Sequence, residues 1–334
     1  MKSVVYVGAE NVEFQNVEKP ESREGWTRIR VSHAGICGSD LNIYAGTHPR
    51  AKAPLILGHE FSGYVDEDNS VFPKGTLVSV NPLLSCGDCE PCKTGNTHVC
   101  NTLKLVGIDC DGGFAEYALV PNDKMVKLPE GVSAKMGAFI EPTAVAVHAL
   151  REGGYKSGDN AVVFGAGTIG LAVAITLKAF GASDITVVET NQFRCDMAKE
   201  LGFKVINPIK ENTVEVIMAA TDGNGADFVV DCAGNQAVAN SLIDAVKVRG
   251  TVLIVAGYKK PAELPLLKGM FKEIDIKFVR VYTHKDFKIA ADMVAKESSF
   301  ERLVTHVLQP EQAKEGFNLL TTGGNAVKVL YKFD

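Results

Sequence analysis

The sequence predicts an α/β protein of two domains, in which an irregular β-rich part is followed by a doubly wound parallel sheet. Three observations lead to this prediction. Short β-branched runs broken by Gly, Pro and Asn fill the first ~135 residues, apolar strands and helices then alternate, and a glycine-rich loop stands near the start of that alternation. A chain of 334 residues also exceeds the length of about 250–300 residues at which one hydrophobic core stops growing.

The first domain is expected to span residues 1–140 and to be built from short strands. Its clearest strand signals are Ser3–Val7, Thr27–His33, Leu77–Val80 and Phe114–Val120. The tail, residues 283–334, is expected to return to this domain with a helix at Asp286–Lys296 and a strand at Ala326–Tyr331.

The second domain, residues 141–282, alternates buried strands with helices, a pattern that indicates a parallel sheet covered on both faces. The expected strands are Ala161–Phe164, Ile185–Val188, Lys204–Ile206, Phe228–Asp231, Thr251–Ala256 and Ile274–Val281. The expected helices are Ala144–Arg151, Thr168–Phe180, Phe193–Leu201, Val214–Thr221 and Gln236–Val246.

Composition and charge restrict the location and the partners. The net charge of −5, without a basic cluster, argues against nucleic acid as a partner. The N-terminus lacks the apolar core of a signal peptide. One apolar window, Ala161 to Phe180, is long enough to cross a bilayer, but its three glycines and Lys178 favour a buried strand followed by a buried helix. We therefore expect a soluble, cytoplasmic protein with no membrane partner.

The glycine-rich loop predicts a Rossmann-type nucleotide site. Residues 165–170 read G-x-G-x-x-G, between a predicted strand and a predicted helix, and that context gives the pattern its meaning. Gly165 permits the tight turn, Gly167 lets the backbone approach a pyrophosphate, and Gly170 allows the helix to pack closely on the strand. Thr168 and Ile169 begin the helix whose N-terminus would receive the phosphates. A glycine turn without a ligand is the alternative.

A carboxylate at the end of the second strand favours NAD over NADP. Glu189 lies roughly twenty residues after the glycine loop, where it can accept hydrogen bonds from both ribose hydroxyls and repel a 2′-phosphate. Arg194 follows five residues later and is suited to stacking on adenine, although it would also tolerate a 2′-phosphate. A solvated carboxylate at the end of a strand is the other interpretation of Glu189.

A loop with four cysteines predicts a structural zinc ion. The spacing C-x2-C-x2-C-x7-C, formed by Cys86, Cys89, Cys92 and Cys100, lets four thiolates surround one tetrahedral ion. An iron–sulfur cluster is less favoured, because a ferredoxin-type run places its fourth cysteine after three residues and before a proline. Disulfides are the remaining alternative, and the scattered cysteines elsewhere in the chain argue against them.

Three other residues suggest a reactive metal. Cys37 lies in GICGSD (35–40), His59 lies in a Gly-His-Glu run, and Glu141 precedes a proline where the two domains meet. A cysteine, a histidine and a carboxylate would form a three-ligand zinc site that is open to water or an alcohol. Such a zinc ion lowers the pKa of a bound alcohol, and hydride then passes from carbon to a nicotinamide.

The chain as a whole resembles the zinc-dependent medium-chain alcohol dehydrogenases, and most closely their polyol branch, which includes sorbitol dehydrogenase. The resemblance covers nearly the whole length and rests on GICGSD (35–40), GHEFSG (58–63), the four-cysteine lobe at about 84–102, DGGFAEY (111–117), IEP (140–142) and GAGTIG (165–170). It implies a GroES-like catalytic domain, two zinc ions per chain, and NAD. It also implies that Cys37 and His59 bind the catalytic zinc. Either Glu60 or Glu141 would be the third protein ligand, with the other acting through water.

The same resemblance suggests roles for two neighbours of the zinc cysteine. Ser39 would hydrogen-bond the substrate oxygen and carry away its proton, and Asp40 would orient His59. A turn hydroxyl and a helix cap are their respective alternatives. Many relatives have a titrating histidine where this chain has Asn42, so a proton relay would use water, Tyr44 or His48.

The predicted function is NAD-dependent oxidation of a secondary hydroxyl on a polyol or sugar-derived substrate. One alternative is a phosphorylated sugar alcohol, held by His48, Arg50 and Lys52, and threonine or butanediol oxidation is another. A non-catalytic nucleotide-binding scaffold is the alternative from a different class of protein. The resemblance implies a homodimer or homotetramer, with the strand at Thr251–Ala256 and the segment after Gly257 as candidate contacts.

Overall fold

The computed structural model describes residues 1–334, and the chain forms two compact units. Unit 1 consists of Met1–Ala144 together with Thr283–Asp334, and unit 2 consists of Val145–Tyr282. The predicted fold class, a β-rich domain with a separate doubly wound parallel sheet, is confirmed. None of the helices has the length and apolar character that a membrane crossing requires.

A seven-stranded sheet forms the centre of unit 1, with the path β10-β6-β5-β3-β18-β17 and β9 paired to β3. Its strands are β3 (Trp26–Gly35), β5 (Glu60–Val65), β6 (Leu77–Val80), β9 (Tyr117–Pro121), β10 (Met125–Lys127), β17 (Val304–Leu308) and β18 (Lys328–Lys332). The N-terminal strand β3 therefore lies between two partners from distant parts of the sequence, with Gly35 opposite Glu60 on one side and opposite Leu330 on the other.

Smaller elements complete unit 1. A three-stranded sheet joins β2 (Asn11–Asn16), β1 (Lys2–Gly8) and β4 (Leu55–Ile56), and β7 (Leu83–Leu84) pairs with β8 (Lys104–Leu105). The helices are α1 (Gly38–Tyr44), α2 (Glu90–Lys93), α3 (Ala134–Gly137), α10 (His284–Lys296) and α11 (Ala313–Thr321). Short 3-10 turns occupy Thr97–Val99, Asn122–Lys124, Ser298–Leu303 and Pro310–Gln312, and α4 (Ile140–Gly153) leads from unit 1 into unit 2.

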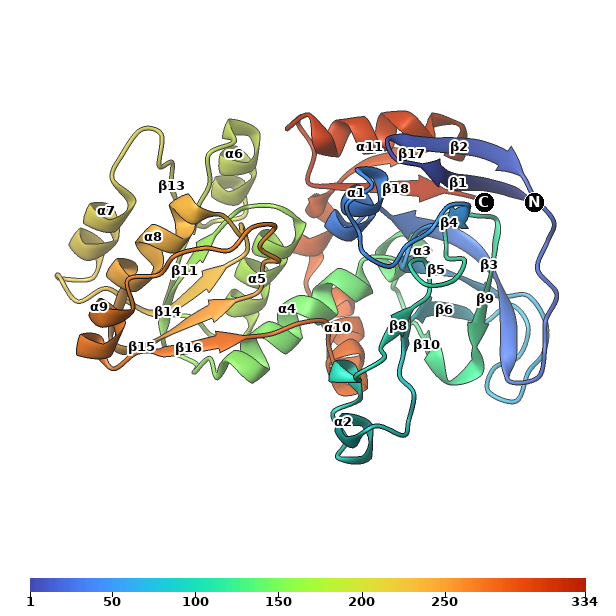
Figure 1. Cartoon of the computed structure of the whole chain (residues 1–334), viewed down its shortest axis with the longest axis horizontal. Coiled ribbons are helices and arrows are strands. Elements are labelled where there is room, and N and C mark those ends of the chain that lie inside the picture. Colours follow the sequence, from blue (N-terminus) through green and yellow to red (C-terminus); the bar gives the residue numbers. More distant parts are fainter. The chain divides into compact units, whose positions relative to one another are not determined.

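Aromatic packing fixes the C-terminal tail onto the N-terminal part of unit 1. The Phe114 ring lies edge-on to the Tyr331 ring at 5.1 Å and to the Phe317 ring at 6.5 Å, and all three side chains are fully buried. Such edge-to-face contacts add to the hydrophobic gain of burying the rings. In Figure 1 the red helix α11 accordingly lies beside the blue strand β2.

Unit 2 is a six-stranded parallel sheet with the order β13-β12-β11-β14-β15-β16. Its strands are β11 (Asn160–Phe164), β12 (Asp184–Val188), β13 (Lys204–Ile206), β14 (Ala226–Asp231), β15 (Val246–Ile254) and β16 (Asp275–Phe278). Its helices are α5 (Thr168–Ala179), α6 (Gln192–Glu200), α7 (Thr213–Ala220), α8 (Gln236–Ala245) and α9 (Leu266–Lys272). The strand order reverses between β11 and β14, and ligands of such sheets bind at the carboxyl ends of the strands beside this reversal.

The apolar window from Ala161 to Phe180 forms β11 and the buried helix α5, as predicted. Several elements have no counterpart among the predictions, including β2, β5, β17, α9 and α11. These segments are only five to nine residues long, and so short a run gives a weak periodic signal in the sequence.

Candidate active site

The first part of the site is the N-terminus of α1, where Cys37 is the N-cap residue. The Cys37 amide donates to Asp40 Oδ2 at 2.9 Å, so the Asp40 carboxylate caps the helix. The other oxygen, Asp40 Oδ1, faces His59 Nδ1 at an ion-pair distance of 3.6 Å, and neither atom has a hydrogen-bond partner in the protein. The helix cap that the sequence analysis offered as an alternative role is therefore present, and the same carboxylate also faces the imidazole.

The second part is the loop that enters β5. Gly58 has a positive φ of 92°, and a Cβ atom there would lie 2.3 Å from the Phe114 ring, so only glycine fits between the ring and the histidine that follows. His59 and Glu60 are both buried. Ser39 Oγ lies 3.4 Å from His59 Nε2, which places the predicted proton carrier beside the predicted metal-binding nitrogen.

Burial dominates the electrostatics of this group. Desolvation raises the pKa of Asp40, and the facing His59 opposes that rise. Desolvation by itself would lower the pKa of His59, but the neighbouring Asp40 and Cys37 outweigh it and raise that pKa. The negative groups around His59 therefore favour a positive charge on its imidazole.

The side chains fit a metal ion. Cys37, His59 and Glu60 bring one ligand atom each within 4.8 Å of one another, and a thiolate, an imidazole and a carboxylate are the ligands that zinc takes in open catalytic sites. Glu141, in the first turn of α4, is buried and acts electrostatically on His59, but it lies outside this three-residue group. The geometry therefore favours Glu60 over Glu141 as the direct third ligand.

The structure adds one residue that the sequence analysis did not consider. Lys328, at the start of β18, is 1% exposed and forms an ion pair with Glu60 Oε2. Its ammonium also donates to the carbonyl oxygen of Ile36 at 2.9 Å, directly before Cys37. A single lysine in a C-terminal tail gives no signal in the sequence that would connect it with a site formed near the N-terminus.

The proposed relay residues differ in their surroundings. His48 Nδ1 accepts from the amides of Arg50 and Ala51, so this nitrogen is engaged in a turn. Burial lowers the pKa of His48 below its ordinary value. The Tyr44 ring packs against Phe317 with centroids 4.8 Å apart.

The four-cysteine loop has the dimensions of a zinc–sulfur centre. The Cys89 Sγ atom lies 3.5 Å from the Sγ atom of Cys92 and 3.8 Å from that of Cys100. The Sγ atoms of Cys86 and Cys92 are 4.0 Å apart. A tetrahedron with Zn–S bonds of about 2.3 Å has sulfurs about 3.8 Å apart. All four cysteines are free thiols, so the disulfide alternative is wrong. The amides of Asp88 and Cys89 donate to Cys86 Sγ and lower the pKa of Cys86 to about 6, which favours the thiolate that a metal requires.

The glycine loop at the carboxyl end of β11 has the conformation that the sequence analysis anticipated. Gly165 has a φ of 97°, and a Cβ atom on Gly170 would lie 1.8 Å from the Gly165 carbonyl oxygen. By contrast, a Cβ atom on Gly167 would meet only Arg194, at 4.0 Å, so the backbone there is open to an incoming group. Thr168 and Ile169 follow in the first turn of α5.

Glu189 lies beside this loop, where it accepts from the Ala166 amide at 2.7 Å through Oε2 and from the Thr190 and Asn191 amides through Oε1. Asp231, at the end of β14, is a further organiser that the sequence analysis missed. Its carboxylate accepts from the Ala233 and Gly234 amides and from the Tyr258 hydroxyl at 2.6 Å, joining the loops that follow β14 and β15.

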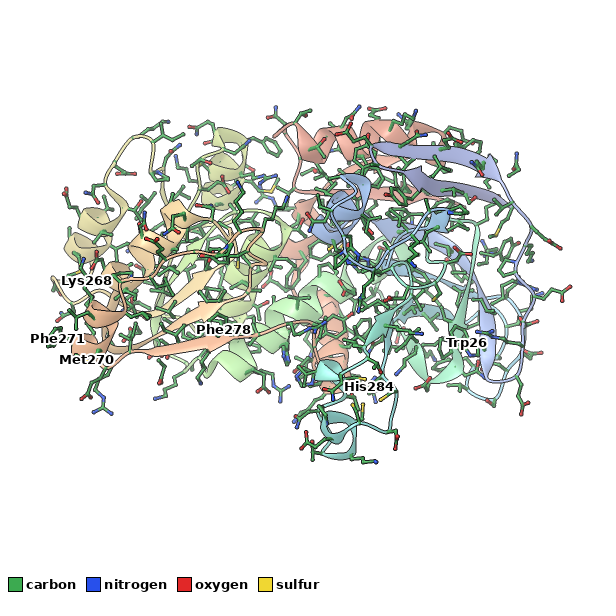
Figure 2. The ribbon with its side chains drawn as sticks, viewed as in Figure 1. Trp26, Lys268, Met270, Phe271, Phe278 and His284 are labelled. Carbon is green, nitrogen blue, oxygen red and sulfur yellow. The ribbon has the colours of Figure 1, made fainter.

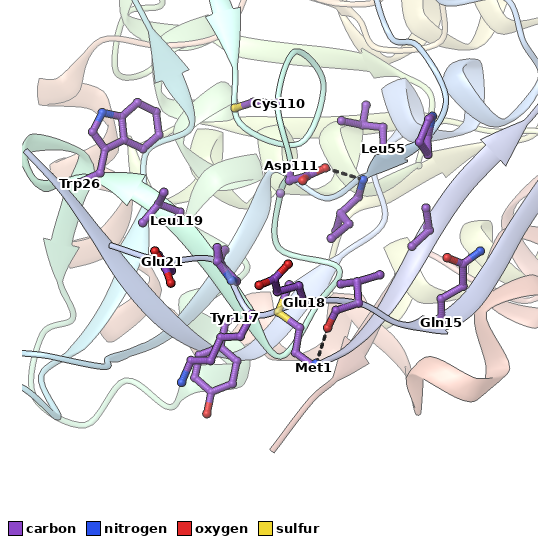
Figure 3. Close-up of a pocket in the computed structure, with 18 of the residues that line it drawn as sticks. Met1, Gln15, Glu18, Glu21, Trp26, Leu55, Cys110, Asp111, Tyr117 and Leu119 are labelled. Atoms are coloured by element: carbon purple, nitrogen blue, oxygen red, sulfur yellow. Dashed lines mark hydrogen bonds between the residues drawn. The ribbon is translucent and has the colours of Figure 1, made fainter. Parts of the chain in front are cut away.

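A cavity of about 720 Å³ occurs elsewhere in unit 1. Figure 3 shows that its lining includes Met1, Glu18, Trp26, Asp111 and Tyr117, and none of the predicted site residues lines it. The exposed acids Glu18 and Glu21 and the mixed character of the lining do not define a ligand.

Comparison with known proteins assigns the class. Residues 23–130 match the alcohol dehydrogenase GroES-like domain, and residues 168–296 match the zinc-binding dehydrogenase family. The chain belongs to the zinc-binding medium-chain alcohol dehydrogenases. The predicted family is thereby confirmed.

Two relatives act on sugar-derived substrates by name. The chain is 35% identical over 299 residues to 2-dehydro-3-deoxy-L-galactonate 5-dehydrogenase of Pseudoalteromonas atlantica, covering 88% of this chain and 87% of the relative. It is 34% identical over 335 residues to a probable D-xylulose reductase A of Aspergillus clavatus, covering 96% and 94%.

Two solved structures with bound nucleotide are also similar. A zinc-binding dehydrogenase of Sinorhizobium meliloti 1021 bound to NADP is 28% identical, with a TM-score of 0.92 and coverage of 99% and 98%. An alcohol dehydrogenase of Escherichia coli CFT073 complexed with NADH is 30% identical, with a TM-score of 0.90 and coverage of 100% and 99%.

Replacing one lobe cysteine tests the zinc–sulfur centre. Cys89→Ser should lower the zinc content from two ions per chain to one and reduce the melting temperature, because a structural zinc ion contributes folding free energy. Metal analysis and calorimetry measure both effects. Cys110 is a free cysteine outside the lobe, so the Cys110→Ser variant is the control and should keep both ions. A Cys89→Ser protein with full zinc content would refute the assignment.

Proposed function

We propose that this protein is an NAD-dependent zinc dehydrogenase that oxidises a secondary hydroxyl of a polyol or sugar-derived alcohol. The observation that carries the proposal is the buried group of Cys37, His59 and Glu60 within 4.8 Å, in a chain whose other unit contains the glycine loop. The substrate class of the two named relatives supports the choice of a polyol or sugar-derived substrate.

Each residue of the candidate active site is assigned one role in this reaction. Cys37 and His59, with Glu60, would hold the zinc ion, and Asp40 fixes the imidazole from its far nitrogen. A zinc ion there supplies Lewis acidity, which lowers the pKa of an alcohol hydroxyl. Ser39 is placed to accept the hydroxyl proton, and hydride leaves the substrate carbon for the nicotinamide of NAD. Glu141 is assigned to the surroundings of the ion, acting through its charge or through water.

Glu189 supports NAD as the cofactor. Its carboxylate is fixed beside the glycine loop by three amides, and a negative charge there would repel a 2′-phosphate. Arg194 Nη1 lies 4.0 Å from the position of a Cβ atom on Gly167, close enough to contact a nucleotide that approaches this glycine. The two similar structures hold NADP and NADH respectively, so selectivity in this chain rests on these side chains rather than on the fold.

A phosphorylated substrate is less well supported. Arg50 belongs to the segment proposed to hold a phosphate, but its guanidinium already has protein partners. It is paired with Asp109 at 3.2 Å and donates to the Leu103 carbonyl at 2.7 Å. With His48 engaged in its own turn, the exposed Lys52 is the main cation left for a phosphate. A non-catalytic scaffold is disfavoured because the candidate zinc ligands Cys37, His59 and Glu60 come together in one buried group.

We also propose that two copies associate through unit 2. Strand β16 is the edge of the parallel sheet, and Met270, Phe271 and Phe278 on α9 and β16 are 62%, 76% and 75% exposed (Figure 2). An open edge beside exposed apolar side chains is characteristic of an association surface. The strand β15 suggested by the sequence cannot itself supply the contact edge, because it pairs with β14 and β16. The eight free thiols fit a reducing, cytoplasmic location.

The central experiment measures NADH formation on a panel of polyols, phosphorylated polyols, butanediol and L-threonine. Cys37→Ala should lower kcat by about 10³-fold or more, because several kcal/mol of Lewis-acid stabilisation are lost, while NAD binding persists. Calorimetric titration with NAD provides the control. Retained turnover in Cys37→Ala would exclude the metal assignment, and activity confined to phosphorylated polyols would overturn the substrate class.

Glu189→Ala should raise KM for NAD by about tenfold or more, because two charge-assisted hydrogen bonds to the ribose are lost. The same change should improve the relative use of NADP, since the repulsion of the 2′-phosphate disappears. Steady-state kinetics with both nucleotides check this. An NADP-to-NAD ratio equal to that of the wild type would remove the role assigned to Glu189.

Phe278→Asp should convert the dimer into a chain of 35.8 kDa, because a charge would be buried in an apolar contact. Sedimentation measures the mass. Ile209→Asp, at a site that is 74% exposed and away from β16, is the matched control and should leave the mass unchanged. A dimer that survives Phe278→Asp would place the contact elsewhere.

A further inference from the structure

Lys328 is the buried cation of unit 1 that touches the candidate metal site. Burying an ammonium is costly unless it is paired and hydrogen-bonded, and Lys328 has both kinds of partner, Glu60 and the Ile36 carbonyl. The lysine and the glutamate are each about 1% exposed, so water does not screen their attraction. Their contact is therefore a strong determinant of where the Glu60 carboxylate lies.

The strand register shows that space is reserved for this pair. Gly35 lies opposite Glu60 in β5 and opposite Leu330 in β18. A Cβ atom on Gly35 would lie 2.4 Å from Glu60 Oε2 and 2.8 Å from Lys328 Cε. The first glycine of the GICGSD motif thus leaves room for the carboxylate and the lysine stem directly beneath Cys37.

Glu60 belongs to two groups at once. Its carboxylate is one of three side chains able to hold a metal ion, and the same carboxylate is in contact with an ammonium. Two cations that attract one carboxylate compete for it. The stronger the hold of Lys328, the weaker the bond that Glu60 can make to an ion held by Cys37 and His59.

We propose that Lys328 is a positioning residue that shares the Glu60 carboxylate with the metal ion and keeps Glu60 a weak, displaceable ligand. The proposal rests on the proposed function, because it requires a metal ion at Cys37 and His59. A weak third ligand leaves the ion accessible to a substrate oxygen, and it also sets the rate at which the ion is lost. Removing Lys328 leaves the Glu60 charge to the ion alone.

The test compares metal release from four purified proteins loaded with zinc, or with cobalt(II) as a spectroscopic probe. These are the wild type and the variants Lys328→Met, Glu60→Gln and the Glu60→Gln/Lys328→Met double variant. Lys328→Met should slow release of the catalytic-site ion to a chelator by about tenfold or more, change the cobalt absorption bands and lower kcat. In the Glu60→Gln background the same lysine change should have no further effect, since the lysine acts through the carboxylate.

Lys332→Met is the matched control. Lys332 lies on the same strand, is only partly buried, and is not part of the group formed by Cys37, His59 and Glu60. If Lys328→Met does not fold, Glu60→Gln and the double variant still carry the comparison, and a difference between their release rates would overturn the proposal. Unchanged release and unchanged cobalt bands in Lys328→Met, or a further slowing in the double variant, would overturn it. Wild-type protein that binds no ion outside the cysteine lobe would instead refute the proposed function itself.

Discussion

The contact between Glu60 and Lys328 ties the chemistry of unit 1 to its topology. A carboxylate removed from water requires a positive neighbour, and this one receives it from the final strand of the chain. Placing that strand next to β3 brings Lys328 beneath Cys37, and the Phe114–Tyr331 ring contact helps to hold it there. The position of Glu60, and through it the third ligand of the candidate metal site, thus depends on a pairing between the two ends of the sequence.

Asp40 and Asp231 play comparable parts in the two units. Both carboxylates are fully buried, and each accepts from at least one backbone amide and faces one polar side chain, His59 for Asp40 and Tyr258 for Asp231. Asp40 joins a helix cap to His59, and Asp231 joins two loops at the carboxyl edge of the parallel sheet. Buried acids used in this way fix the geometry of loops that would otherwise have several conformations.

Elements and sites could be predicted from the sequence where the residues that define them are close together in the chain. The strands of unit 2 follow from short apolar runs, although its helix α9 was missed, and the glycine loop follows from its spacing between a strand and a helix. The cysteine lobe is equally local. What could not be predicted depends on contacts across the chain: Lys328 lies 292 residues from Ile36, and the choice between Glu60 and Glu141 depends on which carboxylate the tertiary fold brings to Cys37. A lone lysine or glutamate is usually solvated, so its sequence context gives no warning of burial.

Unit 1 is formed by two separate segments of the chain, so its parts are synthesised at different times. The cysteine lobe, from Cys86 to Cys100, is complete when less than a third of the chain has been made, and unit 2 is one continuous segment that can fold as a unit during translation. The pocket of Cys37, His59 and Glu60 lacks its lysine until β18 leaves the ribosome. The four cysteines of the lobe can therefore come together early in translation, whereas the candidate metal site gains its lysine only when β18 has been made.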